Sequence, residues 1–489
     1  MLKLIPYPNK VTLKEGVLEK PYKINEIKTL SSLGEEGYKM TIDNDGVTIK
    51  AVSDKGLFYG KQTLKQLEIQ YKNALPFLEI EDSPQYSYRG YMLDCVRHFF
   101  TVEEIKKQID MLALLKINTF HWHLTDDQGW RIKSDKYPLL TEVGGSRKQT
   151  MGDGIKVEGY YSKEDIREIV DYCKQNYINV IPEIDIPGHF RAAIAAYPHL
   201  SCFQQKTIVG EGYGISPYIA CAGKQSVYDF LYDLLDEILE LFPYEYIHLG
   251  GDEALKLNWI TCPDCQKTIQ ENNLKNEEEL QGYFMTKMVK YLNGKGRKVI
   301  NWNDGMLGGN IQGDIVVQYW KESKECKQAA YDEVKKGRKV IVSPFFSFYL
   351  DYPAGMTPLK KTYNYKIDIN MEGNVWGLEA PLWTEHVENV NKLEEMTYPR
   401  LIAVAERNWT KRADYKSFLT RLKYFYKILD MRKIAYSKNP NPFFLKGKFD
   451  MIKFFVNALK KVDKENIKAQ RATKKLLNQK YKSAQKERK

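Results

Sequence analysis

The sequence lacks the features that mark several classes of protein. Its 489 residues contain no uninterrupted apolar span of about 20 residues, the length needed to cross a bilayer. Pro6 and Pro8 interrupt the apolar stretch that a secretory signal would need. The seven cysteines are an odd number scattered through a long chain, which does not indicate a disulfide framework. We therefore expect a protein of a reducing compartment, the cytoplasm, without a membrane partner.

Most of the chain also carries little net charge. The formal net charge is +11, and residues 460–489, with twelve Lys or Arg against three Asp or Glu, contribute +9 of it, which leaves +2 for the rest. This tail lacks the interleaved aromatic residues that single-stranded nucleic acids stack on, and blocks of like charge are usually solvated. We expect a solvated helical or frayed terminus and no nucleic-acid partner, and we leave the oligomeric state open.

The pattern along the chain predicts three parts. Residues 1–85 contain short alternating runs, including two strand-like segments joined across Asp43–Gly46, followed by a helical stretch over 57–70, which is typical of a small α+β domain. Residues 86–435 alternate between strand and helix patterns. Residues 436–489 form the helical, basic C-terminal tail.

The middle part predicts an α/β fold, a (β/α)8 TIM barrel. Amphipathic segments with apolar residues three and four apart separate the apolar runs and predict helices. Eight strand–helix units over about 350 residues meet the requirement of this barrel. The eight runs are 91–95, 119–124, 179–184, 246–251, 298–302, 314–320, 339–343 and 374–379.

Polar and aromatic residues follow the predicted strands at a similar offset. Active sites of such barrels gather at the carboxyl ends of the strands, so these residues predict one pocket. Tryptophans and a tyrosine offer flat faces that suit a sugar ring, and charged hydrogen-bonding groups suit its hydroxyls. Asp252 and Glu253 are adjacent, and neighbours on a regular strand point to opposite faces. Both can face one pocket if the strand ends at Gly250–Gly251.

Other interpretations of individual residues remain open at this point. Asp252–Glu253 alone fits a solvated turn or a helix N-cap. His121 and His123 could be the metal pair of a barrel amidohydrolase, but the chain has few further histidines after the later strands, so we expect core histidines there and at His98. Cys262–Cys265 forms a C-x-x-C without an evident second pair, which favours a loop turn over a metal or redox site. We therefore predict no metal and no cofactor.

Five ordered motifs carry a resemblance to a known family. The chain resembles the glycoside hydrolase family 20 β-N-acetylhexosaminidases from about residue 88 to 410, with the small α+β domain in front also typical of them. The motifs are "RGYMLDCVRHFF", "INTFHWHLTDDQGWR", "PEIDIPGH", "HLGGDEA" and "GLEAPLWTE". The resemblance implies exo-acting, retaining hydrolysis of terminal β-linked N-acetylhexosamine, GlcNAc or GalNAc or both. The acetamido carbonyl of the substrate is the nucleophile and gives an oxazolinium intermediate, an exception to the two-carboxylate rule.

The resemblance also implies roles for residues. Glu253 is the expected general acid and then base, and Asp252 is expected to orient the acetamido N–H and offset the positive charge of the oxazolinium ring. Asp185 and His248 are expected to support this pair. The residues expected to bind the sugar are Arg97, Asp126, His189, Trp302, Trp320, Tyr349, Asp351, Trp383 and Glu385.

One further alternative is a sugar-binding protein without catalysis. Such a protein would keep the aromatic residues and lose the acid, and the presence of Glu253 argues against it. A metal-dependent amidohydrolase would differ from both by losing its activity when metal is chelated. The expected partner in the favoured interpretation is a carbohydrate that ends in N-acetylhexosamine.

Overall fold

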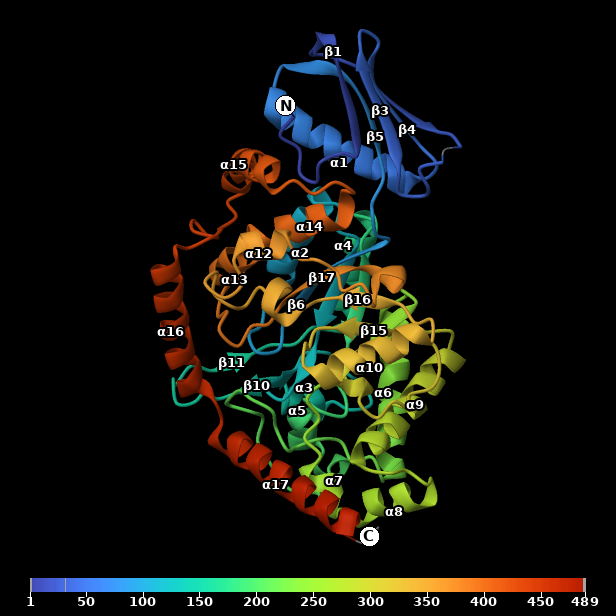
Figure 1. Ribbon diagram of the computed structural model, residues 1–489, viewed down its shortest axis with the longest axis vertical. Helices are drawn as coiled ribbons and strands as arrows, with labels where there is room; N and C mark the ends of the chain where they lie inside the picture. Colours follow the sequence, from blue (N-terminus) through green and yellow to red (C-terminus); the bar gives the residue numbers. More distant parts are fainter. Residues whose placement is uncertain (1, 31, 487–489) are drawn as a thin grey trace.

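The computed structural model describes residues 2–30 and 32–486. Figure 1 shows a small sheet at the N-terminal end, a barrel in the middle, and two C-terminal helices running along one side of the barrel. None of the described helices is long and apolar enough to span a membrane. The barrel with a small domain in front of it is the architecture that the sequence predicts.

The N-terminal part is a five-stranded sheet packed against one helix. Its strands follow the order β1-β5-β3-β4-β2, and β3 pairs with β4 as the hairpin predicted across Asp43–Gly46. Helix α1 (Asp54–Tyr71) begins at Ser53, whose side chain accepts a hydrogen bond from the Gly56 N–H. The strands are β1 (Lys10–Glu19), β2 (Ile24–Lys28), β3 (Tyr38–Asp43), β4 (Gly46–Ala51) and β5 (Ala74–Asp82).

Eight parallel strands close the barrel in the order β6-β7-β12-β13-β14-β15-β16-β17. Most of their residues are buried, which is why they read as apolar runs and not as alternating patterns. All eight predicted runs overlap these strands. Their bounds are β6 (Tyr88–Asp94), β7 (Thr119–His123), β12 (Asn179–Glu183), β13 (Tyr246–His248), β14 (Lys298–Trp302), β15 (Ile315–Tyr319), β16 (Val340–Val342) and β17 (Val375–Leu382).

Helices cover the outside of the barrel (Figure 1). Thr101 and Ser162 start two of them with capping boxes, in which the side chain of the N-cap residue and that of Glu104 or Asp165 each accept a backbone N–H bond. The helices are α2 (Val102–Leu114), α3 (Leu139–Glu142), α4 (Lys163–Gln175), α5 (Arg191–Ala196), α6 (Gln225–Leu241), α7 (Leu257–Thr261), α8 (Pro263–Glu271), α9 (Glu277–Gly294), α10 (Lys324–Lys335), α11 (Phe345–Phe348), α12 (Leu359–Tyr363), α13 (Val390–Thr397), α14 (Arg400–Trp409) and α15 (Tyr415–Met431).

Shorter elements complete the fold. The described connection from β14 to β15 contains the single 3-10 turn η2 (Asn303–Met306) in place of an α-helix. The others are the 3-10 turns η1 (Pro198–Leu200) and η3 (Glu372–Asn374) and the two-residue strands β8 (Thr125–Asp126), β9 (Gly129–Trp130), β10 (Ser146–Arg147) and β11 (Val157–Glu158).

The C-terminal tail is helical, as predicted. Helices α16 (Phe444–Lys461) and α17 (Lys464–Lys486) lie against the barrel side (Figure 1). The turn between them pairs with a long barrel loop, because the Tyr213 N–H donates to Lys461 O and the Asp463 N–H donates to Tyr213 O, at 2.9 and 3.0 Å. The side chain of Asp463 also lies 3.2 Å from Arg191.

Cysteines from different barrel loops meet at the start of α8. Cys262 and Cys265 of the C-x-x-C lie beside Cys202 and Cys221, and all four are buried. The expectation that no second pair accompanies the C-x-x-C is therefore wrong. The two pairs are about 40 to 60 residues apart in sequence and meet because the loops after β12 and β13 pack together.

Candidate active site

A cavity of about 250 Å³ opens at the carboxyl ends of the barrel strands. It collects residues that follow the first, third, fourth, sixth, seventh and eighth strands of the barrel. Nine predicted site residues line it: Arg97, His189, Asp252, Glu253, Trp320, Tyr349, Asp351, Trp383 and Glu385. The repeated offset in the sequence therefore does correspond to one pocket.

Asp252 and Glu253 both reach this cavity because the strand before them ends early. Strand β13 stops at His248, and Gly250, Gly251 and Glu253 have φ values of 62°, 93° and 49°, in the left-handed region. A Cβ on Gly250 would lie 1.8 Å from an oxygen of the Asp185 carboxyl group, so glycine is required there for close approach as well as for its backbone angle. This turn frees the two carboxylates from strand alternation.

His189 connects the carboxylate pair to the supporting groups behind it. Its Nε2 lies 3.6 Å from Asp252 and 3.8 Å from Glu253, and its Nδ1 lies 3.1 Å from Asp126. Burial alone would lower the pKa of this imidazole, but the surrounding carboxylates Asp126, Asp185 and Asp252 raise it well above its usual value. These carboxylates therefore favour the protonated form of the ring.

Burial dominates the ionisation of the pair. It raises the pKa of Asp252 to about 7, with Asp304 and Glu253 adding to the rise and His189 opposing it. It also raises the pKa of Glu253, against the cations of His189 and Lys321. The pKa of Asp185 lies well above its usual range because the group is buried beside Asp252. The site therefore retains a proton near neutral pH.

Arg97 is fixed by acidic groups on several sides. Its guanidinium lies 2.7 Å from Asp126, 3.3 Å from Asp94 and 3.8 Å from Glu385, and its Cζ lies 5.1 Å from the ring centroid of Trp383. Asp126 itself is 1% exposed and is not part of the cavity lining. It lies behind Arg97 and His189, 2.7 and 3.1 Å from them, and its expected contact with substrate stays a prediction.

Aromatic rings form one wall of the cavity. Trp320 and Tyr349 are stacked with centroids 5.9 Å apart, and the Trp320 indole N–H donates to Asp304 at 2.9 Å. Trp302, expected in the same wall, is fully buried and lies behind it, 6.0 Å from Trp383. Its indole N–H donates to Glu183 at 2.7 Å, so Trp302 supports the wall from within the barrel.

Asp351 and Glu385 also line the cavity. Burial raises the pKa of both carboxyl groups. The negative charge of Glu385 adds to the rise at Asp351, and that of Asp94 adds to the rise at Glu385. Arg97 opposes the rise at Glu385. These groups can exchange hydrogen bonds with hydroxyls of a bound ligand.

The histidines on β7 and β13 lie in a buried polar network beneath the cavity. His121 Nδ1 is 3.0 Å from Glu379, His248 Nδ1 is 2.9 Å from Glu183, and His123 bonds to both Glu183 and Asp126. Each ring thus has a carboxylate partner, while His121 Nε2 and His248 Nε2 form no hydrogen bond among the described residues. His121, Glu183 and His248 form one buried group, and the supporting role expected of His248 stays a prediction.

Four lining residues were missed in the sequence: Tyr213, Phe345, Tyr352 and His386. Tyr352 and His386 directly follow the predicted residues Asp351 and Glu385, so adjacency was an available signal. Tyr213 lies in a long loop with no strand register to locate it. Lys321, 4.0 Å from Glu253 and 3.1 Å from Asp304, was also missed, because a lysine after a strand usually indicates solvent.

Comparisons with known proteins show which family the chain resembles. Residues 86–412 match the catalytic domain of glycosyl hydrolase family 20, and residues 19–83 match domain 2 of the same family. A β-hexosaminidase of Porphyromonas gingivalis is 41% identical over 84% of the chain and 56% of its own length. One of Akkermansia muciniphila is 32% identical over 86% of the chain and 90% of its own length. The chain thus spans about half the length of the first relative.

Solved structures give the same result. The crystal structure of a β-N-acetylhexosaminidase superimposes with a TM-score of 0.84 at 31% identity, covering 91% of this chain and 99% of that one. A mutant Streptomyces plicatus β-hexosaminidase in complex with its product GlcNAc superimposes with a TM-score of 0.80 at 28% identity, covering 90% and 97%. On the extent of the family match and the identity to its members, the chain belongs to glycoside hydrolase family 20.

Proposed function

We propose that the protein is an exo-acting, retaining β-N-acetylhexosaminidase that removes a terminal β-linked N-acetylhexosamine from a carbohydrate. The observation that carries this proposal is that Asp252 and Glu253, adjacent in sequence, both face one cavity walled by Trp320, Tyr349 and Trp383. Membership of the family and the names of the relatives support the same activity.

The proposed first step uses the amide of the substrate as nucleophile. Glu253 donates its proton to the glycosidic oxygen while the acetamido carbonyl oxygen attacks the anomeric carbon, so that the bond to the leaving group breaks and an oxazolinium ring forms. Asp252 accepts a hydrogen bond from the acetamido N–H and offsets the positive charge of that ring. Tyr349 donates its hydroxyl hydrogen to the carbonyl oxygen in this proposal.

The second step restores the enzyme. Glu253, now a carboxylate, accepts a proton from water as the water oxygen attacks the anomeric carbon and opens the ring. Two displacements at one carbon give net retention of configuration. Arg97, Asp351 and Glu385 bind the ring hydroxyls and hold the sugar so that its glycosidic oxygen lies next to Glu253.

Conservative substitutions test the two roles. We expect Asp252→Asn and Glu253→Gln each to lower kcat/KM by about two orders of magnitude or more on an oligosaccharide with an unactivated leaving group. Glu271→Gln, at an exposed position on α8, is the matched control and should leave activity unchanged. Near-normal turnover of either site variant would contradict the assigned roles, and circular dichroism should show that all three proteins are folded.

Changes in the substrate test the nucleophile. The protein should cleave 4-nitrophenyl β-N-acetylglucosaminide, and replacement of the acetamido group by hydroxyl should abolish cleavage. Efficient hydrolysis of the plain β-glucoside would contradict substrate assistance. The 4-epimeric N-acetylgalactosaminide reports how Arg97 and Glu385 accommodate the other orientation of O4. A folded protein that binds GlcNAc but hydrolyses none of these substrates would instead be the sugar-binding alternative.

A further inference from the structure

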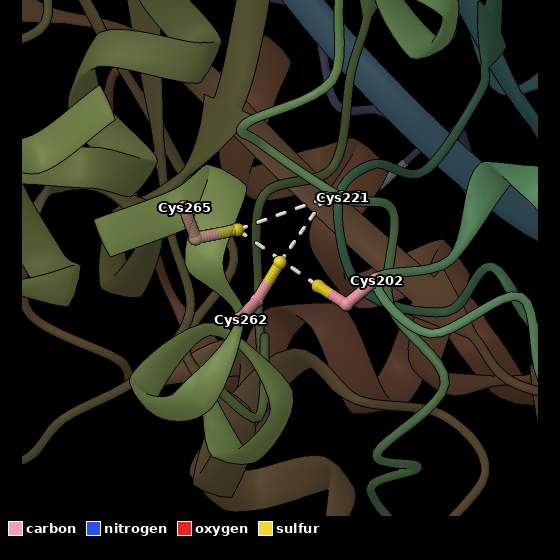
Figure 2. A group of neighbouring side chains, drawn as sticks. All are labelled: Cys202, Cys221, Cys262 and Cys265. Carbon is pink, nitrogen blue, oxygen red and sulfur yellow. Dashed lines mark hydrogen bonds between the residues drawn. The ribbon is translucent and has the colours of Figure 1, made fainter. Parts of the chain in front are cut away.

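Four cysteines form a compact group outside the cavity. Figure 2 shows Cys202, Cys221, Cys262 and Cys265 gathered together, and their sulfur atoms all lie within 4.8 Å of one another. Cys202 and Cys221 come from the loop after η1, Cys262 ends α7, and Cys265 lies in the first turn of α8. We call these four residues the cysteine cluster. None of them lines the proposed substrate cavity.

The spacing of the sulfur atoms matches a metal tetrahedron. The sulfur of Cys265 lies 3.8 Å from that of Cys202 and 3.7 Å from that of Cys221, and the sulfurs of Cys221 and Cys262 are 3.9 Å apart. A tetrahedral centre with metal–sulfur bonds of about 2.3 Å has sulfur–sulfur edges of about 3.8 Å. A disulfide would need about 2.05 Å. The distances between the sulfur atoms of the cysteine cluster therefore fit coordination of one central metal ion.

The surroundings of the cluster suit bound thiolates. Cys221, Cys262 and Cys265 are fully buried and Cys202 is 7% exposed, so solvent does not compete for the site. Cys262 and Cys265 lie at the N-terminus of the nine-residue helix α8, whose free N–H groups favour negative charge. The ammonium group of Lys224 donates to the backbone carbonyls of Ser201 and Cys202, at 2.6 and 2.9 Å, and brings a positive charge close to Cys202.

We propose that the cysteine cluster binds one structural Zn²⁺ ion. Four cysteines in tetrahedral array, with no position left open for water, are the ligand set of structural zinc sites. On binding, each thiol loses its proton to solvent and its sulfur forms a bond to the metal, with no change of oxidation state. This assignment is independent of the proposed function, since no cluster residue touches the cavity.

The ion would fasten two loops that build the active site. The loop of residues 201–223 carries Tyr213 into the cavity wall, and the loop after β13 carries the two proposed catalytic residues. The loops already approach closely: a Cβ on Gly223 would lie 2.3 Å from the backbone of Asp264, and the Trp259 indole N–H donates to Ala220 O at 2.9 Å. A zinc bridge would hold these two loops together at this buried contact.

Metal analysis of the purified full-length protein tests the proposal. We expect about one zinc per chain by elemental analysis, and about none in a Cys262→Ser, Cys265→Ser double variant. Cys173→Ser, at a buried cysteine of α4 outside the cluster, is the matched control and should keep its zinc. Protein refolded or grown with Co²⁺ should show the thiolate charge-transfer band and the strong visible bands of tetrahedral cobalt.

Two measurements keep the test decisive if the double variant fails to fold. Both use the unaltered protein: release of zinc on titration with an organomercurial, and a thiol count after denaturation in chelator. The proposal expects release of one zinc as the cluster thiols react, and seven free thiols. Two disulfides, or four cluster thiols without metal after growth in zinc, would overturn the site. Stoichiometric iron would overturn the choice of zinc. None of these outcomes depends on hydrolytic activity.

Discussion

Lys321 should set the pH at which the proposed acid loses its proton. Its ammonium group lies 4.0 Å from Glu253 and 3.1 Å from Asp304, and Asp304 in turn accepts the Glu253 backbone N–H at 3.1 Å. A nearby cation favours the carboxylate form, so Lys321 holds the pKa of Glu253 below the value that burial alone would give. The substitution Lys321→Met removes this charge and keeps most of the side-chain length.

The distance fixes the size of the expected change. Two unit charges 4.0 Å apart interact by about 1 kcal/mol in water and about 4 kcal/mol at an effective dielectric constant of about 20. Since about 1.4 kcal/mol corresponds to one pKa unit, the pKa of Glu253 should rise by about 0.7 to 3 units. Lys321 is 34% exposed, so solvent screening favours the lower half of this range. The substitution also leaves the negative charge of Asp304 without Lys321 as its partner, and this charge raises the pKa of Glu253 further.

The assay is the pH profile of kcat/KM, which reports ionisations of the free enzyme. An unactivated oligosaccharide is the suitable substrate, because its leaving group needs the proton of Glu253. In the Lys321→Met variant the alkaline limb should move to higher pH by the amount above. Lys335→Met, which removes an exposed lysine of α10 paired with Asp332, should leave the limb in place. An unchanged limb, or one moved to lower pH, would refute either the role of Glu253 or the electrostatic argument.

Two further substitutions probe the turn and the cation behind the pair. His189→Gln removes a positive charge 3.6 Å from Asp252, so the pKa of Asp252 should rise. The acidic limb of the kcat/KM profile should then move to higher pH. An acidic limb that stays in place would show that His189 does not influence the ionisation of Asp252 and Glu253. Gly250→Ala places a Cβ against Asp185 at a residue with a left-handed backbone conformation, so the free energy of unfolding in urea should fall by at least about 1 kcal/mol. Gly373→Ala, at a position with open space around it, should leave the free energy of unfolding unchanged.

The barrel was predictable because its strands are buried on both faces. Each reads as a continuous apolar run, and the run over 298–302 coincides with β14. The one missing helix, between β14 and β15, was not predictable by counting strands, because the connection needs only the turn η2 to cross to the next strand. The register of the site followed from the strand ends, which is why nine predicted residues line the cavity.

The features that the sequence did not predict depend on how deeply a side chain lies behind the cavity and on how the loops pack together. Trp302 and Asp126 occupy the predicted register, but their side chains lie behind the cavity, and depth is decided by neighbours from other strands such as Glu183 and Arg97. The cysteine cluster joins residues on two loops whose contact follows from the folded barrel. The C-x-x-C motif identified Cys262 and Cys265 as a pair in the sequence. Cys202 and Cys221 are too far apart in sequence to form such a motif, so they could not be recognised as the second pair.

The two adjacent carboxylates differ in environment, and this difference supports the different roles proposed for them. Asp252 is 9% exposed at its side chain and lies near His189, whereas Glu253 is 27% exposed and lies near Lys321. In an exo-acting hydrolase the leaving group lies toward the mouth of the cavity, so the acid must be the more exposed of the two. The amide of the terminal sugar lies deeper, where a buried carboxylate interacts most strongly with developing charge. The left-handed turn at Gly250 makes this division possible, because it lets neighbouring residues enter one cavity at different depths.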